Sequence, residues 1–320
     1  MTLISKDIQK AATLLKGGKL VAIPTETVYG LAANIYDQEA VKTIFELKQR
    51  PLFNPLIVHI HSFEQLADLV EEVPEKAKAL TEKFWPGPLS LILKKKSSVP
   101  NLITAGKDTV AIRMPKHPLL LELLQELPFP LAAPSANPFN AISPTNAQRV
   151  KAYFEGQLEM VLEGGSSDRG IESTIVGFEA EEAIVYRLGS LSVETLEKVV
   201  GKVRLANQAK NSPQAPGMLS KHYSPSTPMI LVKEVKQAIV QHKSKKIAIL
   251  GFQNKIEGID EQHQQTLSSS GNLEEAAAKL YEALHKLDDL AVDIIIAERL
   301  PEQGLGNSIN DRLERASASS

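Results

Sequence analysis

Short apolar runs rich in β-branched residues alternate with helical patterns along most of this 320-residue chain. Such alternation is typical of α/β proteins, in which helices cover the faces of a sheet. In the first part of the chain, strands are predicted at 20–24, 56–60, 89–93, 109–114, 160–163, 174–178 and 183–187.

A polar segment interrupts this pattern. Residues 207–226 are rich in Asn, Gln, Ser and Pro and show no apolar period, which is typical of a linker. Beyond it, nearly continuous apolar strands are predicted at 229–232, 247–252 and 292–297, and such strands favour a small parallel sheet covered on both faces. We therefore expect a first α/β domain, a linker and a small Rossmann-like domain, at 1–200, 201–227 and 228–320.

Capping residues predict where helices begin and end. Ser5 is expected to cap a first helix that ends at Gly17-Gly18. Ser62 begins a capping-box pattern, and Ser143-Pro144 predicts a further helix start. In the last domain, helices are expected at 273–287 and 309–316.

Composition excludes several classes of protein. The chain has no cysteine, which removes disulfides, thiolate metal sites and cysteine nucleophiles. No apolar run approaches the ~18–20 residues of a membrane span, and the N-terminus lacks a signal-peptide pattern, so we expect a cytoplasmic protein. The net charge of −2 does not favour a nucleic-acid-coating polycation. Walker-type phosphate loops and Gly-x-Ser-x-Gly elbows are also missing from the sequence.

Two cations at the end of a predicted helix are candidates for phosphate binding. Lys48 and Arg50 could simply offset the helix dipole. Pro51, however, ends the helix directly after Arg50 and fixes both cations at a rigid corner, where they could grip a polyphosphate. His59 lies within an apolar strand, where a histidine is more often a hydrogen-bonded core residue than a catalyst.

Polar residues at the ends of other strands could line a ligand pocket. Arg113 shares one strand face with Thr109 and Ala111, and an arginine on an apolar strand needs an anionic partner, from either the protein or a substrate. The stretch 24–31 is either the edge of a pocket or a threonine-rich turn. Small polar residues at 133–138, 164–166 and 170–175 would let a ligand approach the backbone. This inventory of hydroxyls and cations, with few acids, favours catalysis by positioning and charge stabilisation.

Seven collinear segments carry a resemblance to a known family. They resemble the Sua5/YciO/YrdC family of threonylcarbamoyl-AMP synthases, and the region 215–225 with the end of the chain is similar to its longer, two-domain type. The segments are Pro24-Thr-Glu-Thr-Val-Tyr-Gly-Leu31, Lys48-x-Arg50-Pro, Asn54-Pro-Leu-Ile-Val-His59, Phe84-Trp-Pro-Gly-Pro-Leu89, Val110-Ala-Ile-Arg-Met-Pro115, Ala133-Pro-Ser-Ala-Asn137 and Ile171-Glu-Ser-Thr-Ile175.

The resemblance implies a fold and a reaction. The family's catalytic domain is a YrdC-like twisted mixed sheet surrounded by helices. L-threonine, bicarbonate and ATP would yield L-threonylcarbamoyl-adenylate and pyrophosphate, with Mg²⁺ arriving on ATP rather than in a protein cage. The product would pass to a threonylcarbamoyl transferase that modifies tRNA to N6-threonylcarbamoyladenosine at position 37, and direct contact with tRNA is possible on this reading.

The resemblance also implies roles for individual residues. The family's Lys-x-Arg and Ser-x-Asn motifs place the catalytic group on Lys48, Arg50, Ser135 and Asn137. ATP would contact Arg50, Asn54, Thr109, Ser135, Ser143, Arg187 and Tyr223, the last bringing the linker over the nucleotide as a lid. Threonine would contact Thr27, His59, Arg113, Ala133 and Ser173.

A binding module that recognises RNA or a nucleotide without adenylation is the alternative hypothesis. Such a module needs cations but no buried pocket for a zwitterion. The presence of Arg113 together with Thr27, His59 and Ser173 favours the enzyme.

Overall fold

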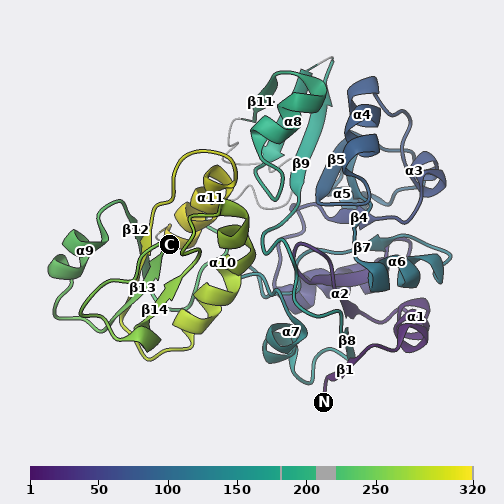
Figure 1. Cartoon of the computed structure of the whole chain (residues 1–320). Coiled ribbons are helices and arrows are strands. Elements are labelled where there is room, and N and C mark those ends of the chain that lie inside the picture. The colour runs from purple at the N-terminus through teal and green to yellow at the C-terminus, as the bar shows by residue number, and fades with distance from the viewer. Residues whose placement is uncertain (181, 207–220, 319–320) are drawn as a thin grey trace.

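The computed structural model describes residues 1–180, 182–206 and 221–318, which form two α/β domains side by side (Figure 1). The described residues of the first domain contribute eleven strands to one sheet. In spatial order these are β1 (Leu3–Ser5), β8 (Met160–Leu162), β2 (Val21–Ile23), β3 (Gly30–Asn34), β7 (Leu131–Ala132), β4 (Ile57–His59), β6 (Thr109–Arg113), β5 (Leu89–Lys94), β9 (Thr174–Glu179), β10 (Glu182–Arg187) and β11 (Val203–Leu205).

The large sheet is mixed. β4 runs parallel to β6, β5 is antiparallel to β6, and β5 is parallel to β9. Buried aliphatic residues of these strands form the main core with the helices that cover them. The predicted mixed α/β sheet is therefore confirmed. The helices are α1 (Ile8–Lys16), α2 (Gln38–Lys48), α3 (Phe63–Leu69), α4 (Glu75–Phe84), α5 (Asn101–Thr104), α6 (Pro118–Gln125), α7 (Ala147–Phe154) and α8 (Val193–Val200).

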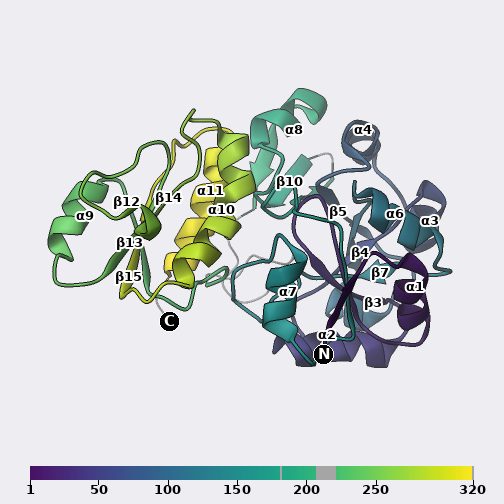
Figure 2. The ribbon, with the colours of Figure 1, turned by 60° about the horizontal axis from the view of Figure 1, so that its bottom comes forward.

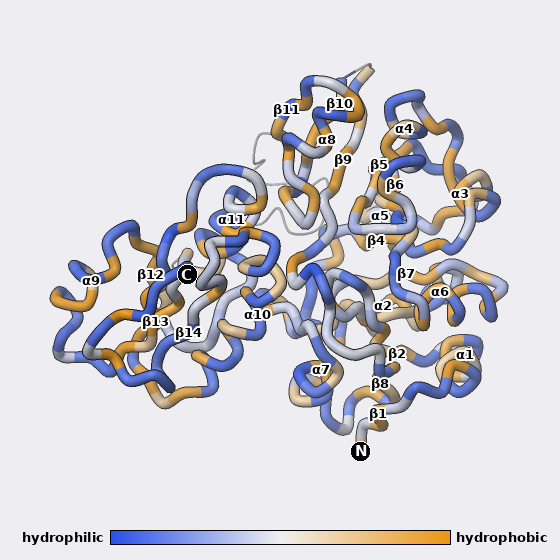
Figure 3. Tube along the Cα trace, in the orientation of Figure 1, coloured by the Kyte–Doolittle hydropathy of each residue, from blue (hydrophilic) through white to orange (hydrophobic). Residues whose placement is uncertain are grey.

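The second domain has an all-parallel sheet, as predicted. Its strand order is β12 (Met229–Val232), β15 (Ile294–Glu298), β13 (Ile247–Gly251) and β14 (Gln264–Thr266), with a short turn η1 (Glu261–His263). α9 (Val235–Gln241) packs on one face, and α10 (Leu273–Asp288) and α11 (Leu305–Ser317) pack on the other. α10 and α11 lie between the small sheet and the first domain (Figure 2). Apolar segments follow the strands and the inner helix faces (Figure 3).

Some elements were absent from the sequence prediction. β11 lies within the range expected to be linker, yet it pairs with β10, so the large sheet extends to Leu205. β3 has the sequence Gly-Leu-Ala-Ala-Asn, which lacks the β-branched residues that indicate strands. Residues 207–220, the greater part of the segment expected to act as a lid, lie outside the described residues.

Two of the predicted helix caps are wrong. Asp7, and not Ser5, caps α1, because its carboxylate accepts from the Lys10 N–H at 2.9 Å. Asn146 caps α7, and Ser143 lies upstream of that helix with its hydroxyl turned to another partner, described below. The Ser62 cap of α3 is confirmed. No helix in the described part of the chain is long and apolar enough to cross a membrane.

Candidate active site

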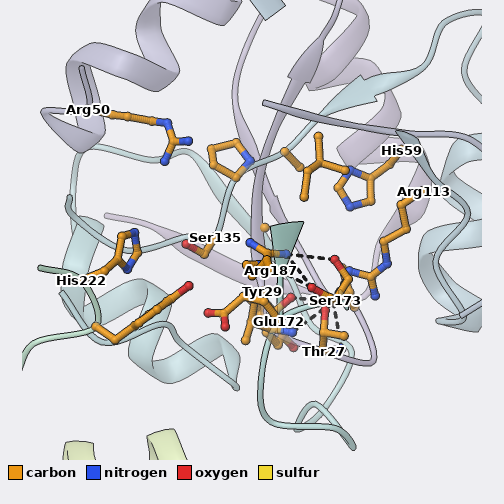
Figure 4. A pocket seen from close by; sticks show the side chains of 17 residues that line it. Thr27, Tyr29, Arg50, His59, Arg113, Ser135, Glu172, Ser173, Arg187 and His222 are labelled. Atoms are coloured by element: carbon orange, nitrogen blue, oxygen red, sulfur yellow. Dashed lines mark hydrogen bonds between the residues drawn. The ribbon is translucent and has the colours of Figure 1, made fainter. Parts of the chain in front are cut away.

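The candidate site is a cavity at one edge of the large sheet (Figure 4). His59 ends β4 and Arg113 ends β6, and the two are register partners on neighbouring parallel strands. Carboxyl ends of parallel strands are the usual place for ligand sites in α/β folds. The cavity is lined by Thr25, Thr27, Val28, Tyr29, Gly30, Arg50, Ile57, His59, Arg113, Ala133, Pro134, Ser135, Glu172, Ser173, Arg187, His222 and Tyr223.

Arg113 is held by protein acceptors on three sides. Its Nη2 forms an ion pair of 2.7 Å with Glu26 Oε1, its Nη1 donates to Thr27 Oγ1 at 2.9 Å, and its Nε donates to the Gly87 carbonyl. Both charged side chains are nearly inaccessible to solvent. The anionic partner that the sequence demanded is therefore a protein carboxylate. Two further guanidinium N–H groups are not used by these contacts and could meet a ligand carboxylate.

His59 is a neutral hydrogen-bonding group in this cavity. Burial, and then the positive charge of Arg113, lower the pKa of His59 to about 3. Its Nδ1 is buried and has no hydrogen-bond partner among the described residues. A neutral imidazole beside Arg113 can accept or donate a hydrogen bond to a polar ligand, but it is too weak a base to take a proton at neutral pH.

Cations dominate the other half of the cavity. The Arg50 guanidinium donates to the Asn54 and Pro55 carbonyls, and no carboxylate among the described residues pairs with it. Burial lowers the pKa of Arg50 to about 9, so it stays protonated at pH 7. Arg187 is also buried and donates to the carbonyl and the hydroxyl of Ser173. Two buried guanidinium groups facing one cavity make it a good receptor for a polyanion.

Lys48 and Asn137 support the cavity without lining it. The Lys48 ammonium donates to the Ser135 carbonyl at 2.6 Å and to the Asn137 carbonyl, and it is almost fully buried. Burial, and then the charge of Arg50, lower the pKa of Lys48. Asn137 donates to the Pro138 and Ala141 carbonyls. The structure therefore uses both side chains to hold the loop that carries Ser135.

A buried carboxylate joins the two domains at the cavity wall. Glu172 accepts from Ser143 Oγ at 2.8 Å, from Tyr281 Oη of α10, and from Arg312 Nε of α11 at 2.8 Å. Burial alone would raise the pKa of Glu172, but the charges of Arg312 and Arg187, with the hydrogen bonds, hold it below its usual value. Arg312 is itself fully buried. The second domain thus supports, through Glu172, the wall of a cavity that belongs to the first.

The described end of the linker packs on this junction. Tyr223 is 1% exposed, its ring stacks on Tyr281 at a centroid distance of 5.7 Å, and Arg312 lies over it at 4.9 Å. His222, next to it, is also buried, and burial with the charges of Arg50 and Lys48 lowers its pKa well below the usual value. Both side chains line the cavity, so the linker reaches the site as expected.

The structure brings together most of the residues singled out from the sequence. Thr27, Arg50, His59, Arg113, Ala133, Ser135, Ser173, Arg187 and Tyr223 all line the cavity. Besides Lys48 and Asn137, three others do not line it. Ser143 is fully buried behind Glu172, and Asn54 is fully buried with its side-chain amide lacking a partner among the described residues. Thr109 begins β6 and lines a separate groove with Gly177 and Tyr186.

Four ionisable residues in or behind the cavity wall were missed at the sequence level, namely Glu26, Glu172, His222 and Arg312. Glu26 and Glu172 lie inside two of the seven segments quoted above, and Arg312 lies near the end of the chain. For Glu26 and Glu172 the signal was a carboxylate within a hydroxyl-rich stretch, whereas Arg312 lies among other charged residues and gave no such signal. The sequence could not show which cation each carboxylate would contact, because Glu172 and Arg312, for example, are 140 positions apart.

Buried histidines predict a stability that falls in acid. Burial, and then the charge of Arg149, lower the pKa of His285 to about 4, so the unfolded chain binds its proton first as the pH falls below 6.5. For each histidine whose pKa is lowered in this way, the free energy of unfolding of the protein should fall by roughly 2 kcal/mol between pH 6.5 and 5. Urea unfolding of His285→Gln should show a smaller loss over this range than the unmodified protein; an equal loss would contradict the prediction.

Comparisons with known proteins cover both domains. A family model described as "Telomere recombination" (Sua5_yciO_yrdC) matches residues 13–189, and one described as "Threonylcarbamoyl-AMP synthase, C-terminal domain" matches residues 191–318. The threonylcarbamoyl-AMP synthases of Pyrococcus abyssi and Bacillus subtilis are 42% and 40% identical, each over 97% of this chain and over 94% and 92% of the relative. The crystal structure of P. abyssi Sua5 complexed with L-threonine is similar with a TM-score of 0.92 and 41% identity, over 99% of this chain and 98% of that one.

Proposed function

Because this chain belongs to the Sua5/YciO/YrdC family over both of its domains, we propose that it converts L-threonine, bicarbonate and ATP into L-threonylcarbamoyl-adenylate and pyrophosphate. The observation that carries the proposal is the division of one cavity into two halves. One half offers Arg113 with polar neighbours, and the other offers Arg50 and Arg187. An amino acid and a nucleotide would meet where the halves join, at Ser173.

The Arg113 half suits a small zwitterion. Its guanidinium can pair with the threonine carboxylate, while Thr27, His59 and the Ala133 backbone supply nearby polar contacts. Glu26 places a negative charge beside Arg113, and this balances the field for a ligand that carries both an ammonium and a carboxylate. A relative crystallised with L-threonine supports threonine as the ligand.

The other half suits ATP. Arg50 and Arg187 would bind the phosphates. Lys48, which holds the Ser135 loop, would add a buried positive charge. An apolar patch on the same sheet, formed by Ile57, Ile92, Ala111, Ile175 and the partly buried Tyr186, offers a floor for the adenine ring. The groove that holds Thr109 shares Ile92 and Tyr186 with this patch, so Thr109 could reach the base or ribose. Asn54 and Ser143 would need to exchange their present surroundings to contact ATP.

The chemistry asked of these residues is mainly positioning. The amine of threonine and bicarbonate form a carbamate with loss of water, and a carbamate oxygen attacks the α-phosphorus of ATP while pyrophosphate leaves. Arg113 would orient the carbamate, and Arg50 and Arg187 would stabilise the charge that develops on the phosphates. Tyr223 and His222, packed over the cavity, would exclude water from the mixed anhydride.

Magnesium would enter with the nucleotide. Glu172 is the one carboxylate among the described residues that line the cavity, and it already accepts from Ser143, Tyr281 and Arg312. No group of three acidic or histidine side chains in the described ranges is placed to hold a metal ion. We propose that phosphate and water oxygens supply most of the ligands of Mg²⁺, whose charge would assist the departure of pyrophosphate.

The product is a labile adenylate, so a second protein must use it promptly. We propose that a threonylcarbamoyl transferase receives it for the N6-threonylcarbamoyladenosine modification of tRNA. The proposal places the hand-over at the linker side of the cavity, where Tyr223 and His222 are the described covering residues.

Pyrophosphate release tests the proposed function against simple nucleotide or RNA binding. Purified protein with ATP and Mg²⁺ should release pyrophosphate only when both threonine and bicarbonate are present. Release without threonine, or no release under any condition, would contradict the proposal and favour a binding module. The ion-paired Arg113 beside His59 and Thr27 favours the enzyme, because a nucleic-acid groove needs exposed rather than buried cations.

A further inference from the structure

Ser173 lies where the two halves of the cavity meet, and its hydroxyl is held by two neighbours. Arg187 Nη2 donates to Ser173 Oγ at 3.0 Å (Figure 4). On the other side, Ser173 Oγ lies 2.8 Å from Ser90 Oγ, and either hydroxyl could donate in that pair. Ser173 lines the cavity, whereas Ser90, in β5, does not.

The direction of the Ser90–Ser173 hydrogen bond follows from the surroundings of Ser90. Ser90 is 0% exposed, and Ser173 is the one hydrogen-bond partner that its hydroxyl has among the described residues. If Ser173 donated, the Ser90 proton would have no acceptor among the described residues, and Ser90 is closed to bulk solvent. A buried donor without an acceptor costs roughly 1–3 kcal/mol, so Ser90 is the donor.

Ser173 Oγ consequently accepts two hydrogen bonds, from Ser90 and from Arg187. A hydroxyl oxygen has two acceptor positions and one proton. With both acceptor positions filled, the Ser173 proton is left for a third partner, and the cavity that the residue lines can supply one. Ser173 is therefore a donor prepared for an anionic oxygen.

We propose that Ser90 is a positioning residue of the threonine site: by donating to Ser173 Oγ, it turns the Ser173 proton toward an anionic oxygen of the bound threonine. The inference rests on the proposed function for the identity of that ligand. Ser90 belongs to β5 and is the register partner of Ile175 in β9, so its hydroxyl is positioned by the sheet rather than by a loop. Such a rigid donor gives a defined orientation at little entropic cost.

Ser90→Ala tests the proposal. Without the donor, the Ser173 proton is free to turn to other directions, and the threonine KM should rise roughly threefold to tenfold, the equivalent of one hydrogen bond. The ATP KM should stay within about twofold, because Arg187 keeps its contacts to Ser173. Ser90→Cys, with a weaker donor of similar shape, should give an intermediate threonine KM.

Ser268→Ala is the matched control. Ser268 is also 0% exposed and hydrogen-bonded, but to Glu275 and Ser270 in the second domain. The Ser268→Ala variant should leave the threonine KM and the ATP KM unchanged. If the threonine KM and the ATP KM both rose in Ser90→Ala and the melting temperature fell, Ser90 would have a general structural role. That result would overturn the proposal.

A double-variant cycle and a binding measurement complete the test. If Ser90 acts only through Ser173, then Ser90→Ala with Ser173→Ala should have the same threonine KM as Ser173→Ala alone; independent, additive effects would overturn the proposal. Calorimetric binding of threonine to the resting protein should weaken in Ser90→Ala by the same factor as the KM. This binding measurement does not require adenylation. If the synthase assay failed but threonine binding still depended on Ser90, the proposed function would be wrong and the role of Ser90 would stand.

Discussion

Arg50→Ala should reduce the rate of threonylcarbamoyl-adenylate formation by roughly a hundredfold or more, since each charge-assisted hydrogen bond to phosphate contributes about 1.5–3 kcal/mol. The guanidinium lines the cavity, is 7% exposed and has no carboxylate partner among the described residues, so its charge is available to ATP. Steady-state kinetics should show the loss with both ATP and threonine saturating.

The burial of Arg50 changes the expected effect on stability. Truncating an exposed cation at a helix end usually changes the free energy of unfolding by under ~0.5 kcal/mol. In the structure Arg50 donates to the Asn54 and Pro55 carbonyls, so alanine should also cost about 1–3 kcal/mol of unfolding free energy. Arg50→Lys retains the charge and separates the two effects. Near-normal turnover in the folded Arg50→Ala protein would refute the phosphate role.

Arg113→Ala should raise the threonine KM roughly 30- to 1000-fold, because a charge-assisted bidentate contact contributes about 2–4 kcal/mol. The ATP KM should change far less. Arg113→Lys should rescue only in part, since lysine lacks the planar fork. The measurement is the pair of KM values from pyrophosphate release. A fall in ATP affinity with threonine affinity preserved would assign Arg113 to the nucleotide.

Glu26 supplies the control for this prediction. Removing Arg113 leaves the buried Glu26 carboxylate without its partner, and breaking a buried ion pair from one side costs about 3–5 kcal/mol. Adding Glu26→Gln removes the orphaned charge. The double variant should therefore regain stability in urea unfolding while keeping the high threonine KM. Recovery of the threonine KM along with stability would show that Arg113 acts on the fold and not on the substrate.

The sequence predicted the strands that place the site better than the partners that complete it. Apolar β-branched runs indicated β4, β6 and β10, and each ends in a predicted site residue, namely His59, Arg113 or Arg187. A local pattern shows which residues leave a strand toward a sheet edge. It does not show tertiary pairing, and so the partner of Arg113 remained open between protein and substrate until Glu26 was placed beside it.

Ser143 also shows that a local sequence pattern does not reveal tertiary contacts. Its position before Pro144 matched a helix start, because Ser-Pro is common there. The tertiary environment overrode that local signal: the Glu172 carboxylate accepts the Ser143 hydroxyl, and Asn146 caps α7 instead. Glu172 in turn depends on Tyr281 and Arg312 from a different domain. Contacts between domains leave no periodic trace in either segment.

The identity of the product tests the central claim most directly. The protein should be incubated with ATP, Mg²⁺, L-threonine and ¹³C-bicarbonate, and the nucleotides separated at once and analysed by mass spectrometry. We expect an adenylate that contains threonine and the labelled carbon, formed in step with pyrophosphate and sharply reduced in Arg113→Ala. Formation of AMP or threonyl-adenylate without the labelled carbon would contradict the account.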